Sequence, residues 1–168
     1  MNKEYPVDAV ELLIHQHRTL EERMKRLHGA TSDLERAALL AEVGDHLSVH
    51  IASEEEIFYP AVRAARTEDI LLESLEEHLS LKRLLADLLA LAPGAPTFEP
   101  KFKVLKEQTE HHHKEEEEHL FPTVCKLIDV SARAALGEQM SAMQRRLQQQ
   151  GAPREAVADQ TVEAAPLR

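Results

Sequence analysis

The chain has 168 residues, of which 43% are hydrophobic, 30% charged and 4% aromatic, and its formal net charge is −10. This length fits one domain with a substantial core, and the scarcity of aromatic residues favours helix over sheet. The acidic balance argues against nucleic acid and anionic membranes as partners and is compatible with cations. Because Cys125 is the single cysteine and no apolar run has the length of a signal peptide or a membrane span, we expect a soluble protein of the cytoplasm.

Hydrophobic residues recur at helical spacing along most of the chain, which predicts an all-α protein. The first helix is expected from Asp8, with Glu11 completing a capping box, to about His28. Further helices are expected over residues 33–65, 68–91, 100–120 and 131–149. Pro60 should kink the helix over residues 33–65 or end its regular part, because proline lacks an N–H and its ring crowds the preceding turn.

Four substantial helices with short connections predict an antiparallel four-helix bundle within residues 1–150. A short fifth helix, capped by Ser131, is expected at its C-terminal end. Residues 151–168 show no convincing apolar face, so we expect them to form a disordered, mobile tail.

Two stretches of the sequence resemble each other: HIASEEEIFYP ends at Pro60 and HHHKEEEEHLFP ends at Pro122. Aligned on these prolines, His50 matches His112 and Glu54 matches Glu116. Upstream, HRTLEERM begins at His17 and HLSLKRLL begins at His78. The chain is therefore interpreted as a duplicated helix pair, in which each half has one histidine on its first helix and a His-x-x-x-Glu on its second.

Residues four apart lie on the same face of a helix, so each His-x-x-x-Glu presents an imidazole and a carboxylate together. A bundle would bring four such faces to one axis, and the predicted metal ligands are His17, His50, Glu54, His78, His112 and Glu116. Two cations roughly 3.5–4 Å apart could share the two glutamates. Imidazole with carboxylate suits iron, manganese or zinc. The competing interpretations are a solvent-facing polar stripe for the duplicated motif and hydrogen-bonded core histidines on the first helices.

The motifs LLIHQH, HIASEEEIFYP, EEHLSLKRLL and HHHKEEEEHLFP together resemble the hemerythrin-like family, the HHE cation-binding domains, over residues 10–130. The resemblance implies a hemerythrin-like bundle holding two iron ions, Fe²⁺ or Fe³⁺, with an oxo or hydroxo bridge. Family members bind oxygen, act on peroxide or nitric oxide, or sense iron and oxygen.

Two positions depart from the pattern of the oxygen-carrying hemerythrins. Those proteins have a second histidine one turn after the one matched by His78, where this chain has Lys82. Their last acidic ligand matches Glu117, whereas the internal repeat favours Glu116, and both remain open. Fewer imidazoles and more carboxylates would favour the ferric state, which makes redox chemistry or sensing a better expectation than reversible oxygen carriage.

Other polar residues near the motifs have open roles. His111 and His113 are expected on the surface, because each lies about 100° from His112 around a regular helix. His119, seven residues after His112, could be an extra ligand or an acid–base group. Tyr59 is expected to point away from the site.

Glu21 and Lys82 occupy equivalent positions of the repeat and are expected to form an ion pair beside the metals. Glu55 or Glu117 could orient a ligand from outside the site. The expected small-molecule partner is a diatomic molecule or peroxide. The leading hypothesis is a di-iron protein that binds or turns over such an oxidant; whether it is an enzyme stays open. The alternatives are a non-catalytic iron or oxygen sensor that signals through a protein partner, and a purely structural bundle.

Overall fold

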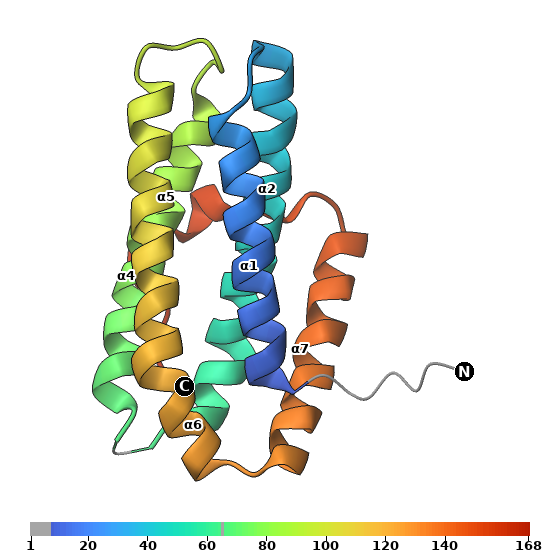
Figure 1. Cartoon of the computed structure of the whole chain (residues 1–168), viewed down its shortest axis with the longest axis vertical. Coiled ribbons are helices and arrows are strands. Elements are labelled where there is room, and N and C mark those ends of the chain that lie inside the picture. Colours follow the sequence, from blue (N-terminus) through green and yellow to red (C-terminus); the bar gives the residue numbers. More distant parts are fainter. Residues whose placement is uncertain (1–7, 65) are drawn as a thin grey trace.

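The computed structural model describes residues 8–64 and 66–168, and this part of the chain is helical and contains no strand. The elements are α1 (Ala9–His28), α2 (Asp33–Ser53), η1 (Glu54–Phe58), α3 (Tyr59–Val62), α4 (Glu68–Ala90), α5 (Phe98–Glu115), η2 (Glu116–Leu120), α6 (Phe121–Leu127), α7 (Val130–Gln149) and η3 (Pro153–Gln160). The helices α1, α2, α4 and α5 form an antiparallel bundle, and α7 lies beside α1 and α2 (Figure 1). The predicted all-α bundle is confirmed.

The ends of the helices agree with the sequence signals at most positions. Asp8 caps α1, and its side chain accepts a hydrogen bond from the Val10 N–H at 2.8 Å. The cap of α7 is Asp129, which accepts from the Ala132 N–H at 2.8 Å, so the prediction of Ser131 as this cap is wrong. The predicted fifth helix over residues 131–149 agrees with α7 to within one residue, although a helix of 20 residues is not short. The expected end of the second helix at Ala65 and residues 1–7 lie outside the described residues.

The second helix of each half widens for one turn at its glutamate. The elements η1 and η2 are π-turns, in which the Tyr59 N–H bonds to the Glu54 carbonyl and the Phe121 N–H to the Glu116 carbonyl, five residues earlier. Pro60 follows directly after Tyr59, and Pro122 occupies the same place in the other half. Since the proline ring cannot fit the narrower α-turn, the duplicated prolines explain the duplicated π-turns. The prediction that the regular helix ends near Pro60 is confirmed.

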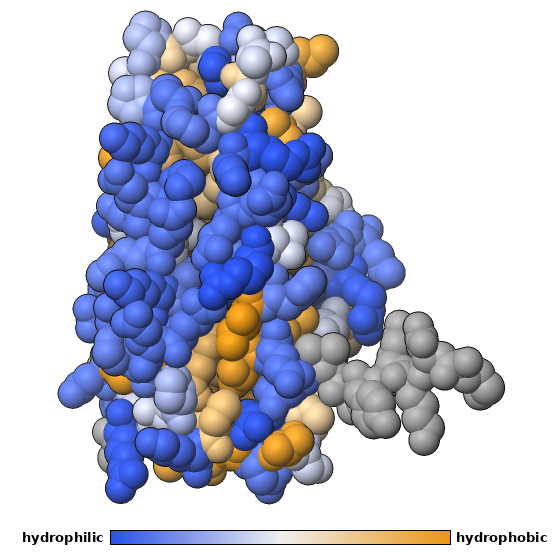
Figure 2. Space-filling view, in the orientation of Figure 1, coloured by the Kyte–Doolittle hydropathy of each residue, from blue (hydrophilic) through white to orange (hydrophobic). Residues whose placement is uncertain are grey.

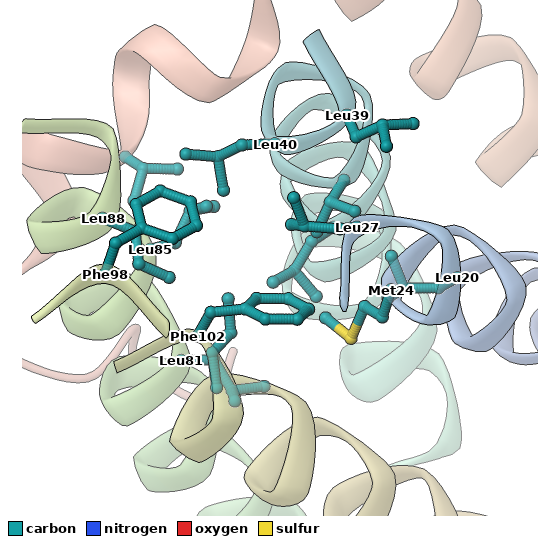
Figure 3. Close-up of a cluster of buried hydrophobic side chains, with 14 of the residues drawn as sticks. Leu20, Met24, Leu27, Leu39, Leu40, Leu81, Leu85, Leu88, Phe98 and Phe102 are labelled. Atoms are coloured by element: carbon teal, nitrogen blue, oxygen red, sulfur yellow. The ribbon is translucent and has the colours of Figure 1, made fainter. Parts of the chain in front are cut away.

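Two apolar clusters fill the bundle, one toward each end. The first, which we call the upper core, consists of Leu20, Met24, Leu27, Leu39, Leu40, Val43, Leu47, Ile51, Leu81, Leu85, Leu88, Phe98, Phe102, Leu105 and Val157 (Figure 3). The second, the lower core, consists of Ala9, Val10, Leu13, Phe58, Tyr59, Val62, Leu71, Leu75, Leu120, Phe121, Val124 and Met140. The upper core joins α1, α2, α4 and α5, and the lower core joins α1 and α4 to the segments that follow α2 and α5 and to α7.

The C-terminal segment packs against the bundle, contrary to the expected disordered tail over residues 151–168. The element η3 contacts α2 and α4, and Val157 is buried in the upper core. Arg154 donates to the Asp45 carboxylate at 2.7 Å. A Cβ on Gly44 would lie 3.1 Å from the Cβ of Arg154, so the glycine lets this segment approach α2 closely. One buried valine among polar residues gives too weak a periodic signal for sequence analysis.

The face of the molecule seen in Figure 2 is mostly hydrophilic, with a narrow hydrophobic strip in its lower half. Among the described residues, no helix combines the length and the hydropathy required to span a bilayer.

Candidate metal centre

A layer of polar side chains lies between the two apolar cores. On α1, His17 lies between Leu13 of the lower core and Leu20 of the upper core. The same order holds on α4, where His78 lies between Leu75 and Leu81. Helix α2 with η1 and helix α5 with η2 contribute one His-x-x-x-Glu each. The apolar clusters on either side therefore fix the height of this polar layer along the bundle.

The structure brings all six predicted ligands together in this layer. His17, His50, Glu54, His78, His112 and Glu116 are each no more than 1% exposed. Ligating atoms lie within 4.8 Å of one another in two overlapping groups: His17, His50, Glu54 and Glu116 in one, and Glu54, His78 and His112 in the other. We call the first pair of histidines the His17 side and the second pair the His78 side. Their role as ligands stays a prediction.

The two glutamates join the sides. The Oε1 of Glu54 lies 3.3 Å from the Nε2 of His50, and its Oε2 lies 3.1 Å from the Nε2 of His78. The Oε1 of Glu116 lies 3.0 Å from the Nε2 of His112 and 3.7 Å from that of His17. Each carboxylate thus faces one imidazole of either side, which is the arrangement expected of bridging ligands.

Most of the nitrogen and oxygen atoms that could bind a metal in the layer have no hydrogen-bond partner among the described residues. Such atoms are both nitrogens of His17, the Nε2 of His50, both oxygens of Glu54 and the Oε1 of Glu116. Buried polar groups are nearly always paired, because leaving one unpaired costs roughly 1–3 kcal/mol. A divalent or trivalent cation would satisfy these lone pairs at once, so the residues fit a metal site. The mixture of imidazole nitrogen and carboxylate oxygen suits iron, manganese or zinc.

The two buried carboxylates differ in their proton affinity. Burial, followed by repulsion from the Glu116 carboxylate, raises the pKa of Glu54 well above its usual range. Burial also opposes ionisation of Glu116, but the His112 imidazolium outweighs it and lowers the pKa of Glu116. The environment thus favours the protonated form of Glu54 and the ionised form of Glu116.

The imidazoles of the layer divide in the same way. Burial lowers the pKa of His17, His50 and His78, which favours their neutral rings. At His112 burial acts in the same direction, but the Glu116 and Glu77 carboxylates raise the pKa to about 9. A metal ion would have to displace this proton, because only the deprotonated nitrogen can bind it.

Each predicted ligand histidine has a polar group behind it, at its Nδ1. The Nδ1 of His50 lies 2.9 Å from the Gln16 Oε1, and that of His112 hydrogen-bonds to the Glu77 carboxylate. Gln16 and Glu77 are equivalent in the repeat, since each directly precedes the histidine of its first helix. Outer partners of this kind fix the ring so that Nε2 faces the metal.

The other two histidines have partners from the opposite half of the repeat. The Nδ1 of His78 lies 3.1 Å from Glu55, and the Nδ1 of His17 lies 3.5 Å from Glu117. Glu55 and Glu117 are again equivalent positions. Their expected role outside the ligand set agrees with this geometry. It also favours Glu116 over Glu117 as the ligand that faces the layer.

His113 was expected on the surface, and the structure shows that this is wrong. It is 1% exposed, and its ring stacks on that of His17 with centroids 3.7 Å apart. The helix faces the core over an arc wide enough to include two consecutive residues. The available signal was Ile51, the apolar residue at the equivalent position of the first half. His111 is exposed, as expected.

Tyr59 was expected to point away, and this is also wrong. Its hydroxyl lies 3.2 Å from the His78 Nε2 and donates to the Glu116 Oε2 at 3.4 Å. A regular α-helix would turn Tyr59 away from the face of His50, but the π-turn at η1 adds a residue and rotates it inward.

The expected ion pair between Glu21 and Lys82 does not form. Lys82 donates to Glu55 at 2.9 Å, and Glu21 instead accepts from Arg18 at 2.7 Å. Lys82 therefore lies behind His78, bonded to the carboxylate that orients it. His119, a candidate extra ligand, is exposed, lies 3.6 Å from Glu115 and is not part of the buried layer.

A four-helix bundle with imidazoles and carboxylates converging on a dry central layer defines the class of helical bundles built to hold cations in their core. Residues 8–124 match the model of the family described as the hemerythrin HHE cation-binding domain, and residues 75–164 match it again. The first match covers well over half of the chain, so the chain belongs to the hemerythrin HHE cation-binding domain family.

Two individual proteins resemble the chain. The crystal structure of a hemerythrin HHE cation-binding domain-containing protein from Mycobacterium kansasii, an Rv2633c homolog, superposes with a TM-score of 0.78 and 24% identity, covering 92% of this chain and 99% of that one. A DNA nickase from Nostoc sp. (strain PCC 7120) is 33% identical over 78 residues, which is 46% of this chain but only 22% of that protein. The chain thus spans a small part of the nickase, and the similarity to the M. kansasii protein concerns the fold.

Proposed function

We propose that the chain is a non-haem di-iron protein that binds or turns over a small oxidant, namely oxygen, peroxide or nitric oxide. The observation that carries this proposal is the position of Glu54, which lies without a hydrogen-bond partner between an imidazole of each side. A carboxylate placed in this way suits a shared ligand of two cations. Bound iron would supply the redox chemistry, which none of these side chains provides.

The residues of the chain would hold and orient the ions. The imidazoles of both sides supply neutral nitrogen donors, while Glu54 and Glu116 supply negative charge in a dry environment. The Gln16, Glu55 and Glu77 side chains hydrogen-bond three of the rings from behind, and the Glu117 carboxylate lies 3.5 Å from the fourth, His17. This outer layer keeps the donors in place before a metal binds, which lowers the reorganisation that binding requires.

Aromatic side chains close the centre toward the lower core. Phe58 and Phe121 are buried and meet edge to face with ring centroids 5.9 Å apart, and Phe121 stacks over His17 at 5.8 Å. A cavity of about 310 Å³ lined by the C-terminal segment reaches Lys82, which lies outside the layer. An apolar wall and the burial of the layer favour ligands of two or a few atoms over organic substrates.

The test is anaerobic loading with Fe²⁺, followed by metal analysis and exposure to each oxidant in turn. We expect about two irons per chain and near-ultraviolet charge-transfer absorption after oxidation. Rapid peroxide consumption would identify an enzyme, while spectral change without turnover would identify a carrier or sensor. A wild-type protein that takes up no iron, or whose absorption is unchanged by oxygen, peroxide and nitric oxide, would contradict the proposal.

One observation favours sensing as a second candidate function. Gln144 of α7 donates to the Oε1 of Gln16 at 3.2 Å and to Ser53 at 2.8 Å, and Gln16 contacts His50. The outer helix is therefore hydrogen-bonded to the partner of a predicted ligand. If iron signals through this contact, hydrogen exchange in α7 should differ between iron-free and iron-loaded protein, and Gln144→Ala should abolish that difference. Equal exchange in both states would exclude α7 as the transmitter.

A further inference from the structure

Comparison of the two halves of the repeat shows where the centre departs from symmetry. Ile51 of the first half and His113 of the second half occupy equivalent positions, and both are buried, with 3% and 1% exposure. Ile51 packs in the upper core. An apolar side chain therefore suits this place in the fold, and a histidine is not required for packing.

His113 has no hydrogen-bond partner. Both of its ring nitrogens are buried and unpaired among the described residues. The ring instead packs against the rings of two predicted ligands, His17 and His50. A buried imidazole without a partner destabilises the fold, and such a residue in a native structure indicates a missing ligand.

The position of His113 identifies what that ligand is. Ring nitrogens of His17, His50 and His113 lie within 4.8 Å of one another. The ring of His113 lies parallel to that of His17, with an interplanar angle of 8°, and edge-on to that of His50 at a centroid distance of 5.5 Å. These three imidazoles form the third group of candidate ligands in the layer, and it contains no carboxylate.

On the opposite side of the centre, residues 8–64 and 66–168 provide no third imidazole. One turn after His78 the chain has Lys82, and its ammonium group is bonded to Glu55 behind the layer. The additional polar group on the His78 side is instead the hydroxyl of Tyr59. The two sides thus differ in composition, with nitrogen donors concentrated on the His17 side.

We propose that His113 is a metal ligand, and that it forms with His17 and His50 a three-imidazole position opposite a two-imidazole position formed by His78 and His112. This rests on the proposed function, in that the layer must bind metal. Because two parallel rings cannot both direct an in-plane lone pair at one ion, the His113 or His17 ring turns when the ion binds. The three-imidazole position should prefer borderline divalent ions such as Co²⁺, Zn²⁺ and Fe²⁺.

The test uses two variants and a matched control. His113→Ile copies the residue of the first half and should fold, since Ile51 already occupies the equivalent place. His113→Gln keeps the ring position polar, and His111→Gln changes the adjacent exposed histidine as a control. Anaerobic calorimetric titration with Co²⁺ measures the affinity of each ion separately, and thermal unfolding of the metal-free proteins measures their stability.

We expect wild type and His111→Gln to bind two ions with distinct affinities. Both His113 variants should weaken one of the two by at least about 10–100-fold, the range reported for loss of an outer partner, and leave the other nearly unchanged. Metal-free His113→Ile should unfold at the same or a higher temperature than wild type, because an unpaired buried polar group has been removed.

The outcomes separate the two proposals. If wild type binds no Co²⁺ and no Fe²⁺, the metal function fails. If wild type binds two ions and both His113 variants keep both affinities, His113 is not a ligand while the metal function stands. A lower unfolding temperature of His113→Ile with unchanged ion binding would instead make His113 a packing residue.

Discussion

At the scale of single residues, Glu54 combines full burial with the lack of any hydrogen-bond partner. Replacing it with glutamine should reduce bound iron from about two ions per chain to less than one, because both sides lose their shared carboxylate. The metal-free variant should be at least as stable as wild type, since burial disfavours the charged carboxylate. Metal analysis and thermal unfolding check this, with the exposed Glu56→Gln as control. Full iron occupancy of Glu54→Gln would contradict a bridging role.

Glu77 makes a second prediction about a single residue, because it hydrogen-bonds the Nδ1 of His112. Glu77→Gln should lower the affinity for one metal ion about 10–100-fold. A neutral amide holds the His112 ring less firmly than a carboxylate and makes its nitrogen less basic. Titration with Co²⁺ measures the effect, and Glu76→Gln on the same helix is the matched control. The reciprocal change, Gln16→Glu, should raise the affinity for the ion bound by His50. Equal metal affinities of the Glu77→Gln, Glu76→Gln and Gln16→Glu variants would contradict the role of the outer partners.

The six residues that converge in the buried layer could be predicted from the sequence, because the duplicated His-x-x-x-Glu marked four of them and the repeated context of HRTLEERM and HLSLKRLL marked His17 and His78. Their role as ligands remains a prediction. His113 could not be found from angles around His112, because a bundle helix buries an arc and not a line. The contacts of Gln16 with His50 and of Glu77 with His112 could not be predicted either, because Gln16 and Glu77 differ in charge although they occupy equivalent positions of the repeat. The sequence thus predicted the positions of the donors but not what stands behind them.

At the scale of elements, the π-turns and the C-terminal segment were the features that helical periodicity missed. The prolines signalled a break but not its kind, so Tyr59 was assigned to the wrong face. The four long helices were predictable because each has an apolar stripe, although only α1 and α2 have a side-chain N-cap. The element η3 carries only one fully buried apolar residue, Val157, and such a short signal cannot be separated from noise.

The docking of η3 leads to a third prediction. Val157→Asp should release residues 150–168 from α2 and α4, because Val157 is 3% exposed and a buried charge there has no partner. The loss should reach about 1.5–3 kcal/mol, the contribution of burying a valine. Urea unfolding and limited proteolysis near Gly151 measure it. Val162→Asp is the control, since Val162 is 84% exposed, and equal stability of both variants would mean that η3 contributes nothing.

At the scale of the whole molecule, the number of buried neutral histidines makes stability depend on pH. His46 is the clearest case, since burial, together with the nearby Arg23, lowers its pKa to about 4. The Arg23 guanidinium contacts its Nδ1 at 2.9 Å, and His15 and His17 also face it.

The sign follows from the number of protons bound. Between pH 6.5 and 4 the unfolded chain protonates His46 and the folded chain does not, so acid favours unfolding. The stability associated with His46 is present above pH 6.5 and lost as the pH falls toward 4, by up to about 3 kcal/mol. Urea unfolding of metal-free wild type and His46→Gln across this range should show a smaller loss for the variant. His119→Gln is the exposed control, and identical curves for wild type and His46→Gln would contradict the assignment.

The interior consists of two apolar cores with a polar layer between them, and this arrangement affects the stability of the metal-free protein. The upper core joins side chains of α1, α2, α4 and α5, and the lower core joins side chains of α1, α3, α4, α6 and α7, so both ends are packed without an ion in the layer between them. The protein should therefore stay folded when metal is removed and bind metal again without refolding, unlike small domains that unfold when their ion is lost. The rate at which a chelator removes the metal would then be set by how fast ions leave the buried layer, and not by unfolding of the bundle.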